Sequence, residues 1–345
     1  MQIANCGCRG VDTRMTFVPF NSQFAIHNLN MAIGDHTTGM VNGSRRPAGR
    51  NRTLFLSAED RRRIPVQAFE PNGPVKLAEV VDRVTCGDSM RILPLLPAGC
   101  ADLVMADPPY NVGKDFGVGR CRWRREQYAQ WLDGWLGQCA RLLRPGGSVY
   151  VCCDWRFSGL VHEVLDNLLT VRNRITWRRE KGRGAKRNWK NNLEDIFFAT
   201  RGEDYTFNLS AVKVRKEVIA PYRDLAGQAK DWREDEDGLK VRQTHPSNIW
   251  TDLAVPFWSM PENTPHPAQK SEKLLERILL ASSNEGDLVL DPFLGSGTTA
   301  VVARRLKRRF VGLEMNPDYC RLAIKRLARE EAGTGKKEHG TGEKA

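Results

Sequence analysis

The chain has 345 residues, of which 41% are hydrophobic, and this is enough for one large α/β domain with a smaller inserted region. Its 53 Lys and Arg outnumber its 41 Asp and Glu, and the net charge of +12 favours a polyanionic partner such as nucleic acid over an ordinary basic enzyme. The absence of a long apolar run and of regular spacing among the nine cysteines excludes a membrane span, a disulfide framework and a zinc site, so we expect a cytoplasmic protein without bound metal.

The first part of the chain, residues 1–75, is rich in Asn, Gly, Arg and Thr without a sustained period, which predicts a loosely ordered extension. From about residue 80, strands alternate with helices. The segments that predict strands here are RVTCGD, ADLVMAD, SVYVCCD, RITWR and EDIFFAT. Helical spacing of apolar residues predicts a helix in REQYAQWLDGWLGQCARLLRPGG, stopped by Pro145-Gly146-Gly147, and another over residues 158–169.

Residues 201–262 show clusters of charge with many Trp and Pro and no clear period. Regular elements return after this region. They are a helix over 271–283, a strand in DLVLD, a helix after Gly297, a strand in RFVGLE and a helix over 317–330. The charged, Gly-rich residues 331–345 predict a disordered tail. Strands that alternate with helices are typical of an α/β fold with a doubly wound, mostly parallel sheet.

The segment LVMADPPYNVGKDFG, residues 103–117, contains an acid, two prolines and a tyrosine at the end of a predicted strand. The strand has to end at Asp107, because proline fixes its own φ and has no N–H to donate to a sheet. A proline-kinked strand end with a capping Asp would give the same pattern. The segment therefore becomes informative only together with a second motif.

The second motif is DLVLDPFLGSGTTAVVA, residues 287–303, in which a strand ends at Asp291 and a helix begins near Thr298. The loop between them places backbone N–H groups and a helix N-terminus at the carboxyl end of a strand, where doubly wound sheets bind ligands. Glu314 ends the next strand, 23 residues after Asp291 (314 − 291), and can accept hydrogen bonds from both ribose hydroxyls of a nucleoside. The glycines also suit a turn needed only for close helix packing. No pyrophosphate-binding run follows, so a ligand with a cationic, amino-bearing end such as S-adenosylmethionine fits better.

Together, Asp107-Pro108-Pro109-Tyr110 and Asp291-Pro292-Phe293 with its glycine loop resemble the amino-methylating DNA methyltransferases. The first motif precedes the second by 184 residues (291 − 107), which resembles the permuted, beta-class order. The resemblance covers roughly residues 80–330. It implies a Rossmann-like methyltransferase fold, with a catalytic domain over 76–200 and 263–330 and a target-recognition region over 201–262.

The implied activity is methyl transfer from S-adenosylmethionine to the N6 amine of adenine in double-stranded DNA, by base flipping. An exocyclic amine is a poor nucleophile because its lone pair is delocalised into the ring. In the implied mechanism, Asp107 and the backbone carbonyl of Pro108 each accept one N–H of the amine. Pro109 stiffens the turn, and Tyr110 gives the flipped base a face to stack on.

Further residues are implied to bind the cofactor. HPAQK, from His266 to Lys270, resembles the segment that holds the methionine part in this class; the usual Pro after the Lys is Ser271 here, a good helix N-cap. For His266, a turn residue packed on a proline is an equal alternative. The implied cofactor-binding residues are Asp88, Asp107, His266, Lys270, Asp291, Phe293, Gly295, Gly297, Thr298, Thr299 and Glu314.

Residues 172–190 contain nine Lys or Arg and one Glu, a net charge of +8 (9 − 1), with Trp177 and Trp189 among them. This pattern favours contact with a phosphate backbone, although a solvated surface loop is also basic. The expected DNA-binding residues are Arg178, Arg179, Lys181, Arg183, Lys186, Arg187 and Lys190. The resemblance also allows a homodimer and a cognate restriction endonuclease as partners.

The target base has alternatives. Asp as the first residue of the Asp-Pro-Pro-Tyr box favours adenine N6, but cytosine N4 has the same chemistry. No Cys follows a Pro, which argues against covalent attack on cytosine C5. RNA enzymes with similar boxes generally place the glycine loop first, unlike this chain. A catalytically silent DNA-binding regulator on the same fold is the other alternative. It has no need of all four of Asp107, Tyr110, Asp291 and Glu314 intact.

Overall fold

The structure, a computed structural model, describes residues 50–112, 123–179, 187–219, 222–229 and 231–338. The described residues belong to one compact unit, Pro47–Ala345. Residues 1–49 of the expected extension and 339–345 of the expected tail lie outside the described residues.

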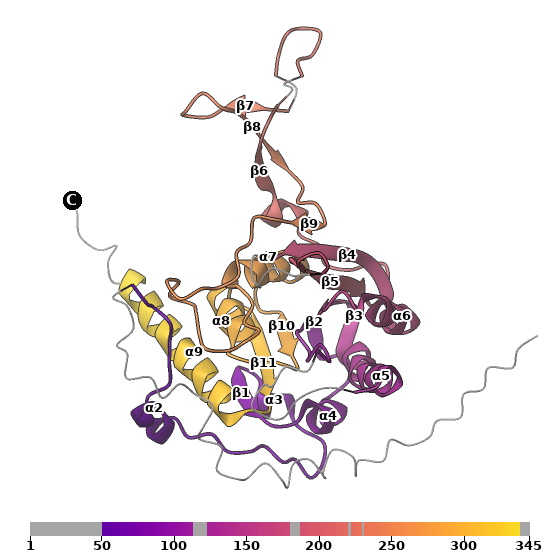
Figure 1. Ribbon diagram of the computed structural model, residues 1–345, viewed down its shortest axis with the longest axis vertical. Helices are drawn as coiled ribbons and strands as arrows, with labels where there is room; N and C mark the ends of the chain where they lie inside the picture. The colour runs from indigo at the N-terminus through magenta and orange to yellow at the C-terminus, as the bar shows by residue number, and fades with distance from the viewer. Residues whose placement is uncertain (1–49, 113–122, 180–186, 220–221, 230, 339–345) are drawn as a thin grey trace, which may run out of the picture. The chain divides into compact units, whose positions relative to one another are not determined.

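An eight-stranded sheet forms the centre of the fold, in the order β1-β11-β10-β2-β3-β5-β4-β9 (Figure 1). Only β5 runs antiparallel to its neighbours, and every other pairing is parallel. The strands are β1 (Arg83–Cys86), β2 (Ala101–Ala106), β3 (Leu143–Cys153), β4 (Thr170–Arg178), β5 (Leu193–Thr200), β9 (Ile249–Trp250), β10 (Leu288–Asp291) and β11 (Arg309–Glu314). The predicted mostly parallel α/β sheet is therefore confirmed.

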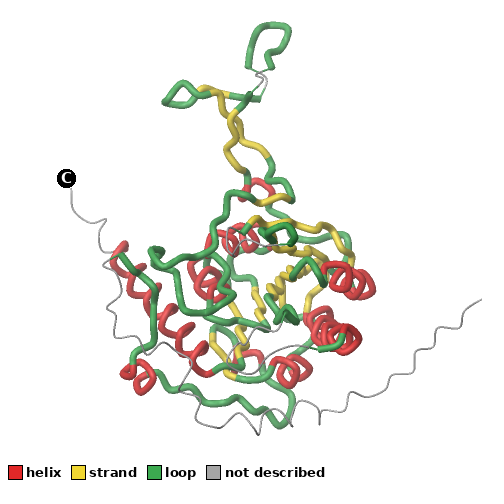
Figure 2. The backbone as a smooth tube through the Cα atoms, viewed as in Figure 1, coloured by secondary structure: helices red, strands yellow, loops and turns green. Residues whose placement is uncertain are grey.

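Helices pack on both faces of this sheet, as the arrangement of red and yellow segments in Figure 2 shows. The helices are α3 (Leu77–Val80), α4 (Ser89–Ile92), η1 (Leu93–Leu95), α5 (Arg125–Leu142), α6 (Ser158–Leu168), α7 (Glu272–Ser282), α8 (Thr298–Arg305) and α9 (Pro317–Glu338). Alternate residues of β2 face different cores: Val104 packs in one cluster with α5 and α6, and Leu103 in another with α7 and α8. Burial on both faces explains why the strand sequences are continuously apolar.

The expected target-recognition region, 201–262, contains a second, three-stranded antiparallel sheet in the order β6-β8-β7. Its elements are η2 (Leu209–Val212), β6 (Val214–Glu217), β7 (Arg233–Glu234) and β8 (Lys240–Thr244). The same region also supplies β9 to the large sheet, where Trp250 and Leu253 are buried. Part of this region thus belongs to the main core.

Two expectations differ from the structure at the ends of the described chain. Residues 50–75 are not loosely ordered: they form α2 (Ala58–Arg63), and Asp60 and Arg61 pair with Lys325 and Asp318 of α9, at 2.5 and 3.1 Å. These contacts join segments at opposite ends of the described chain, so the sequence of residues 50–75 alone does not reveal them. The last helix continues to Glu338 instead of ending at 330, with Glu330 paired to Arg305 of α8 at 2.7 Å.

The helix stop predicted at Pro145-Gly146-Gly147 lies a few residues earlier. Helix α5 ends at Leu142 and β3 begins at Leu143, so the prolyl-glycyl segment is part of the strand. Gly146 has a φ of +79°, and the pairing of β2 with β3 shifts register between Ala101 and Leu103. Across the described residues, no helix is both long and apolar enough to span a membrane.

Candidate active site

Three carboxylates lie at the carboxyl edge of the large sheet. Asp291 and Glu314 are the last residues of β10 and β11, and Asp107 directly follows β2. These strands are parallel neighbours, because β10 pairs with β11 on one side and with β2 on the other. The Asp-Pro-Pro-Tyr box and the glycine loop therefore lie side by side, as expected for ligands at the carboxyl edge of such a sheet.

The box is held by side chains outside it. The hydroxyl of Tyr128, in α5, donates to the carbonyl of Pro109 at 2.9 Å. Asn111 has a φ of +55°, and its side-chain amide bonds the backbone N–H and C=O of Trp123 at 2.5 and 2.9 Å. These contacts fix the turn after Asp107. The role of the Pro108 carbonyl as an acceptor stays a prediction.

Asp107 is one member of a buried cluster of charges. Its carboxylate accepts a hydrogen bond from the Tyr110 hydroxyl and lies 2.6 Å from the ammonium of Lys270. Both donors also reach Oε1 of Glu194, at 2.7 Å for Tyr110 and 2.8 Å for Lys270. The other oxygen of Glu194 pairs with Arg179. Two carboxylates and two cations thus share one hydrogen-bonded network.

The surroundings set the charge of each group. Burial raises the pKa of Asp107, and the nearby Glu194 carboxylate adds to this against the lowering effect of Lys270. Burial also opposes ionisation of Glu194, but the two cations Lys270 and Arg179 outweigh it and hold its pKa below the ordinary value. The pKa of Lys270 is raised because both carboxylates outweigh its burial. Glu194 is therefore the more firmly ionised acid, since it has two cationic partners and Asp107 has one.

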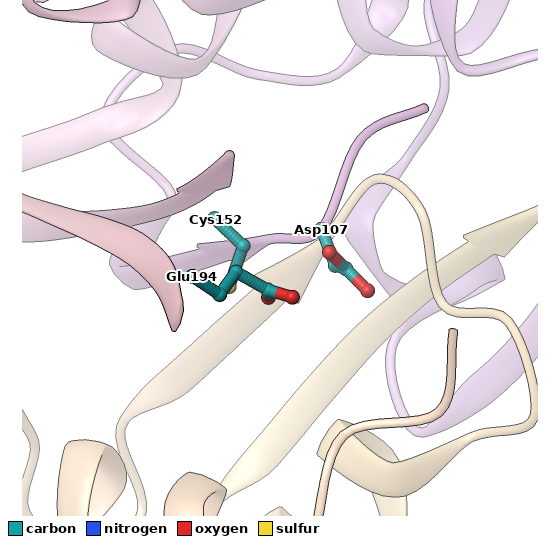
Figure 3. A group of neighbouring side chains, drawn as sticks. All are labelled: Asp107, Cys152 and Glu194. Carbon is teal, nitrogen blue, oxygen red and sulfur yellow. The ribbon is translucent and has the colours of Figure 1, made fainter. Parts of the chain in front are cut away.

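The side chains of Asp107, Cys152 and Glu194 converge, and their ligand atoms lie within 4.8 Å of one another (Figure 3). Such a set can hold a metal in principle. Here, however, the Lys270 ammonium already contacts both carboxylates. Burial raises the pKa of the Cys152 thiol well above its ordinary value, so it stays protonated. The donor set fits an ammonium ion better than a metal ion.

The glycine loop is organised by the two other carboxylates. Asp291 accepts from the backbone N–H of Phe293 at 2.9 Å and from the hydroxyl of Thr299 at 2.6 Å. Glu314 accepts from the backbone N–H of Gly295 at 2.8 Å. Gly297 has a φ of +85°, and a Cβ there would lie 2.6 Å from Cβ of Ala323 in α9. Close helix packing is thus one reason for this glycine, as the alternative interpretation held.

The carboxyl edge suits a cationic ligand. Burial raises the pKa of Asp291 to about 7, with Asp107 and Glu314 adding to the effect. Burial likewise raises the pKa of Glu314 and of Asp107. A positive charge bound between these acids would lower all three pKa values and be stabilised in return.

The structure places the remaining expected cofactor residues around this loop. Asp88 caps α4 by accepting from the backbone N–H of Met90 at 2.9 Å. The ring of His266 packs edge-on against Tyr319 and lies beside Gly295, so it contacts the loop rather than only a proline. Phe293 packs against Trp135 of α5, with ring centroids 5.0 Å apart.

Lys270 joins the two motifs. Its carbonyl accepts from the hydroxyl of Thr298 in the glycine loop at 3.3 Å, whereas its ammonium lies in the Asp107 cluster. The side chain of Lys270, expected among the cofactor-binding residues, lies in the Asp107 cluster, and its role toward the cofactor stays a prediction. Its backbone is the part that contacts the glycine loop.

The expected DNA-binding residues divide into three groups. Lys181, Arg183 and Lys186 lie outside the described residues. Arg178, Arg187 and Lys190 are exposed, and Arg178 also donates to the carbonyl of Thr251 at 3.2 Å. Arg179 points inward to Glu194.

The two tryptophans of this segment also differ from each other. Trp189 is 96% exposed, whereas Trp177 is 1% exposed and donates its indole N–H to the carbonyl of Leu253 at 2.8 Å. Trp177 is therefore a core residue and is not available for contact with DNA. Trp189 is the exposed aromatic residue of the segment, and its contact with DNA stays a prediction.

Glu194 is the site residue that the sequence analysis missed. It is the second residue of β5 and the first of the segment EDIFFAT, in which Asp195 and an apolar run follow it. Its exposed fraction is 1%. A charge in a buried strand requires partners, so the pattern itself carried a signal. The identity of the partners depended on which strands are neighbours.

The known proteins that this chain resembles are DNA methyltransferases. Residues 101–325 match a family model described as DNA methylase, of the N6/N4 type. The chain is 33% identical over 254 residues to the Type II methyltransferase M.HpaI of Haemophilus parainfluenzae, covering 73% of this chain and 76% of that protein. It is 34% identical over 256 residues to the DNA adenine methyltransferase YhdJ of Escherichia coli K12, covering 74% and 85%.

Two solved structures share the fold. The cytosine-N4-specific PvuII DNA methyltransferase aligns with a TM-score of 0.54 at 20% identity, over 73% of this chain and 89% of that one. A DNA modification methylase of Thermus thermophilus, complexed with S-adenosyl-L-methionine, aligns with a TM-score of 0.50 at 23% identity, over 72% and 93%.

Proposed function

The chain belongs to the N6/N4 DNA methylase family and is a DNA methyltransferase that uses S-adenosylmethionine, and we propose that its target is the N6 amine of adenine in duplex DNA. The observation that carries this proposal is the position of Asp107, largely buried at the end of β2 beside the glycine loop that follows β10. The relative named as a DNA adenine methyltransferase supports adenine as the base. Asp as the first residue of the box favours the same base over cytosine N4.

The carboxyl edge is the proposed cofactor site. When bound, S-adenosylmethionine supplies an electrophilic methyl group on a positively charged sulfur. We assign Glu314 to accept from ribose hydroxyls, and the backbone of the loop from Gly295 to Thr298 to offer N–H groups. Asp88, at the end of the neighbouring β1, is assigned to the adenine end. Buried acids with raised pKa values fit a ligand that is cationic at its reacting end.

The chain's own residues prepare the amine. Asp107 and the Pro108 carbonyl each accept one N–H, which favours a tetrahedral nitrogen with its lone pair free to react. A nitrogen that has gained a methyl group carries one proton too many, and Asp107 is the nearest base that can accept it. Burial strengthens these hydrogen bonds, because the surroundings have a low dielectric constant.

The base has to leave the duplex to reach this site. Tyr110 offers its ring as the stacking face, and its hydroxyl is bonded to Asp107 and Glu194. These bonds hold the ring at a fixed place beside the catalytic carboxylate. Stacking and positioning are thus combined in one side chain.

The proposed DNA surface consists of Arg178, Arg187, Lys190 and the exposed Trp189. Target recognition is assigned to residues 201–262, with their three-stranded sheet, and catalysis to 76–200 and 263–330. Charges near a phosphate backbone position the duplex, while base contacts specify the sequence.

Further partners follow from the names of relatives. The relative M.HpaI is named as a Type II methyltransferase, which supports a cognate restriction endonuclease as a functional partner. The homodimer stays a prediction that light scattering of the purified protein tests. We place the protein in the cytoplasm, with the DNA; the six cysteines of the described segments are free thiols, which suits a reducing compartment.

The deciding experiment is nucleoside mass spectrometry of duplex DNA treated with the purified protein and S-adenosylmethionine. N6-methyladenine in the treated DNA is expected, and Asp107→Ala serves as the inactive control. N4-methylcytosine instead would overturn the choice of base, and no methylated nucleoside in DNA would favour a silent DNA-binding regulator. The same assay with RNA tests the RNA alternative.

A further inference from the structure

Glu194 lies opposite Asp107 and shares both of its hydrogen-bond donors. The Tyr110 hydroxyl bonds Oδ1 of Asp107 and is 2.7 Å from Oε1 of Glu194. The Lys270 ammonium is 2.6 Å from Oδ2 of Asp107 and 2.8 Å from the same Oε1. Glu194 belongs to neither of the two motifs, and the mechanism above gives it no task.

The arrangement poses a problem for the proposed function, on which this inference rests. The target amine has to donate an N–H to Asp107, yet each oxygen of this carboxylate already accepts from one donor. The Lys270 ammonium at this distance also offsets the negative charge of Asp107, and this charge should strengthen the hydrogen bond to the target amine. Both donors therefore need another acceptor when the base arrives.

We propose that Glu194 is a positioning residue that takes over the hydroxyl hydrogen of Tyr110 and the charge of Lys270 when the target amine binds Asp107. A tyrosine hydroxyl has one hydrogen, so it donates either to Asp107 or to Glu194, and a rotation about the C–O bond exchanges them. The ammonium has three hydrogens and already reaches Asp107, Glu194 and the Tyr110 oxygen, the last at 3.0 Å. The exchange of the hydroxyl hydrogen needs no displacement of heavy atoms. The ammonium, which already contacts Oε1 of Glu194, has only to move away from Oδ2 of Asp107.

Glu194 is suited to this role because it remains ionised. Arg179 pairs with its second oxygen and so leaves Oε1 for the two shared donors. The charges of the two carboxylates, Lys270 and Arg179 sum to zero, so the exchange moves no net charge into the buried site.

The groups that face Asp107 come from every neighbouring element. They are Tyr110 of the box, Cys152 of β3, Glu194 of β5, Arg179 next to β4, Lys270 before α7 and Asp291 of β10. Among them, Glu194 raises the pKa of Asp107 and Lys270 lowers it. Removal of these two charges should therefore shift the acidic limb of the reaction's pH profile in opposite directions.

The test measures the single-turnover methylation rate of Glu194→Gln and Lys270→Met on duplex DNA across pH. Glu194→Gln keeps the shape of the side chain and loses its charge. Its rate should fall about 10- to 100-fold, the effect of one charge-assisted hydrogen bond, with S-adenosylmethionine affinity within about twofold. Its acidic limb should move to lower pH, because Asp107 ionises more easily. The limb of Lys270→Met should move to higher pH.

Asp195→Asn is the matched control. Asp195 follows Glu194 in β5, points to the other face of the sheet, and pairs with Arg174 of β4 at 2.9 Å. Its loss breaks a similar cross-strand pair away from Asp107, so the limb should stay at the wild-type pH. Glu194→Asp, which keeps the charge, should return the limb to the wild-type position and provides a second variant if the first does not fold.

A wild-type rate and an unshifted limb in Glu194→Gln would overturn the inference, as would shifts of the same sign in Glu194→Gln and Lys270→Met. If the wild-type protein methylates adenine and only these variants behave otherwise than expected, the proposed function stands and the role of Glu194 falls. If the wild-type protein leaves adenine unmethylated, the proposed function falls first.

Discussion

Lys270 and Asp107 are 163 positions apart in the chain (270 − 107), and their side chains form a buried ion pair of 2.6 Å. The pair links the segment before α7 to the end of β2. Because the carbonyl of Lys270 also accepts from Thr298, one residue connects the proposed acceptor site with the proposed cofactor loop. Changes at either motif should therefore be tested for effects on the other.

Asp107→Ala should abolish methyl transfer, because no other carboxylate is in the box to accept the target amine. Binding of S-adenosylmethionine should change by less than about tenfold, or about 1.4 kcal/mol. Isothermal titration and a methylation assay measure the two effects separately. Asp102→Asn, at the opposite end of β2, is the control and should stay active. Wild-type turnover in Asp107→Ala would rule out the mechanism.

Glu314→Ala should weaken S-adenosylmethionine binding by about 1.5–3 kcal/mol, the size of a charge-assisted hydrogen bond. The loss has two sources, since Glu314 also holds the backbone N–H of Gly295. Glu285→Ala removes an exposed acid that pairs with Lys307, and it should bind as wild type does. Equal affinities of the Glu314 and Glu285 variants would remove the assignment.

Tyr110→Phe should keep the stacking face but lose the hydroxyl that bonds Asp107 and Glu194. We expect about a tenfold loss of rate from the lost hydrogen bonds. Tyr110→Ala should lose more, because base stacking adds about 1–3 kcal/mol. A mismatch at the target base should partly rescue the Ala variant, since a mispaired base is easier to extrude. If the mismatch raised the methylation rate of the wild type, Tyr110→Phe and Tyr110→Ala by the same factor, stacking on Tyr110 would not be coupled to base flipping.

Neutralising Arg178, Arg187 and Lys190 should weaken binding to all DNA sequences alike. Each lost phosphate contact should flatten the slope of log affinity against log salt by about 0.9. Fluorescence anisotropy at several salt concentrations gives this slope. An unchanged slope would make the segment an ordinary solvated surface.

Affinity for S-adenosylmethionine should rise with pH through the range around neutrality. Burial raises the pKa of Asp291 to about 7, so below this pH the group is mainly neutral and offers a cationic ligand little attraction. Above it, the ionised carboxylate favours the bound cation, and the ligand in turn lowers its pKa. Titrations about one pH unit either side of this value test the effect. Asp291→Asn should bind more weakly and lose the pH dependence.

Local sequence patterns were enough to predict the order of most elements and the two motifs. Pro108 and Pro109 end β2 because they cannot donate to a sheet, and this places Asp107 at a strand end regardless of the rest of the fold. The loop after Asp291 is also recognisable from the sequence, because its glycines and the start of the following helix are local features. Local chemistry of this kind leaves a pattern in consecutive residues.

Which charged side chains pair with one another depends on the packing of elements that are distant in the chain. Glu194 lies beside Asp107, and Arg179 pairs with Glu194, because β5 and β4 follow β2 and β3 in the sheet. The apolar pattern of a single strand does not show which strands are its neighbours. The same holds for the burial of Trp177 and for the pairing of Asp60 with Lys325, which orders a segment whose composition predicted a loosely ordered extension. A buried charge in a sequence shows that a partner is needed, because desolvation is costly, but only the packing of distant elements selects that partner.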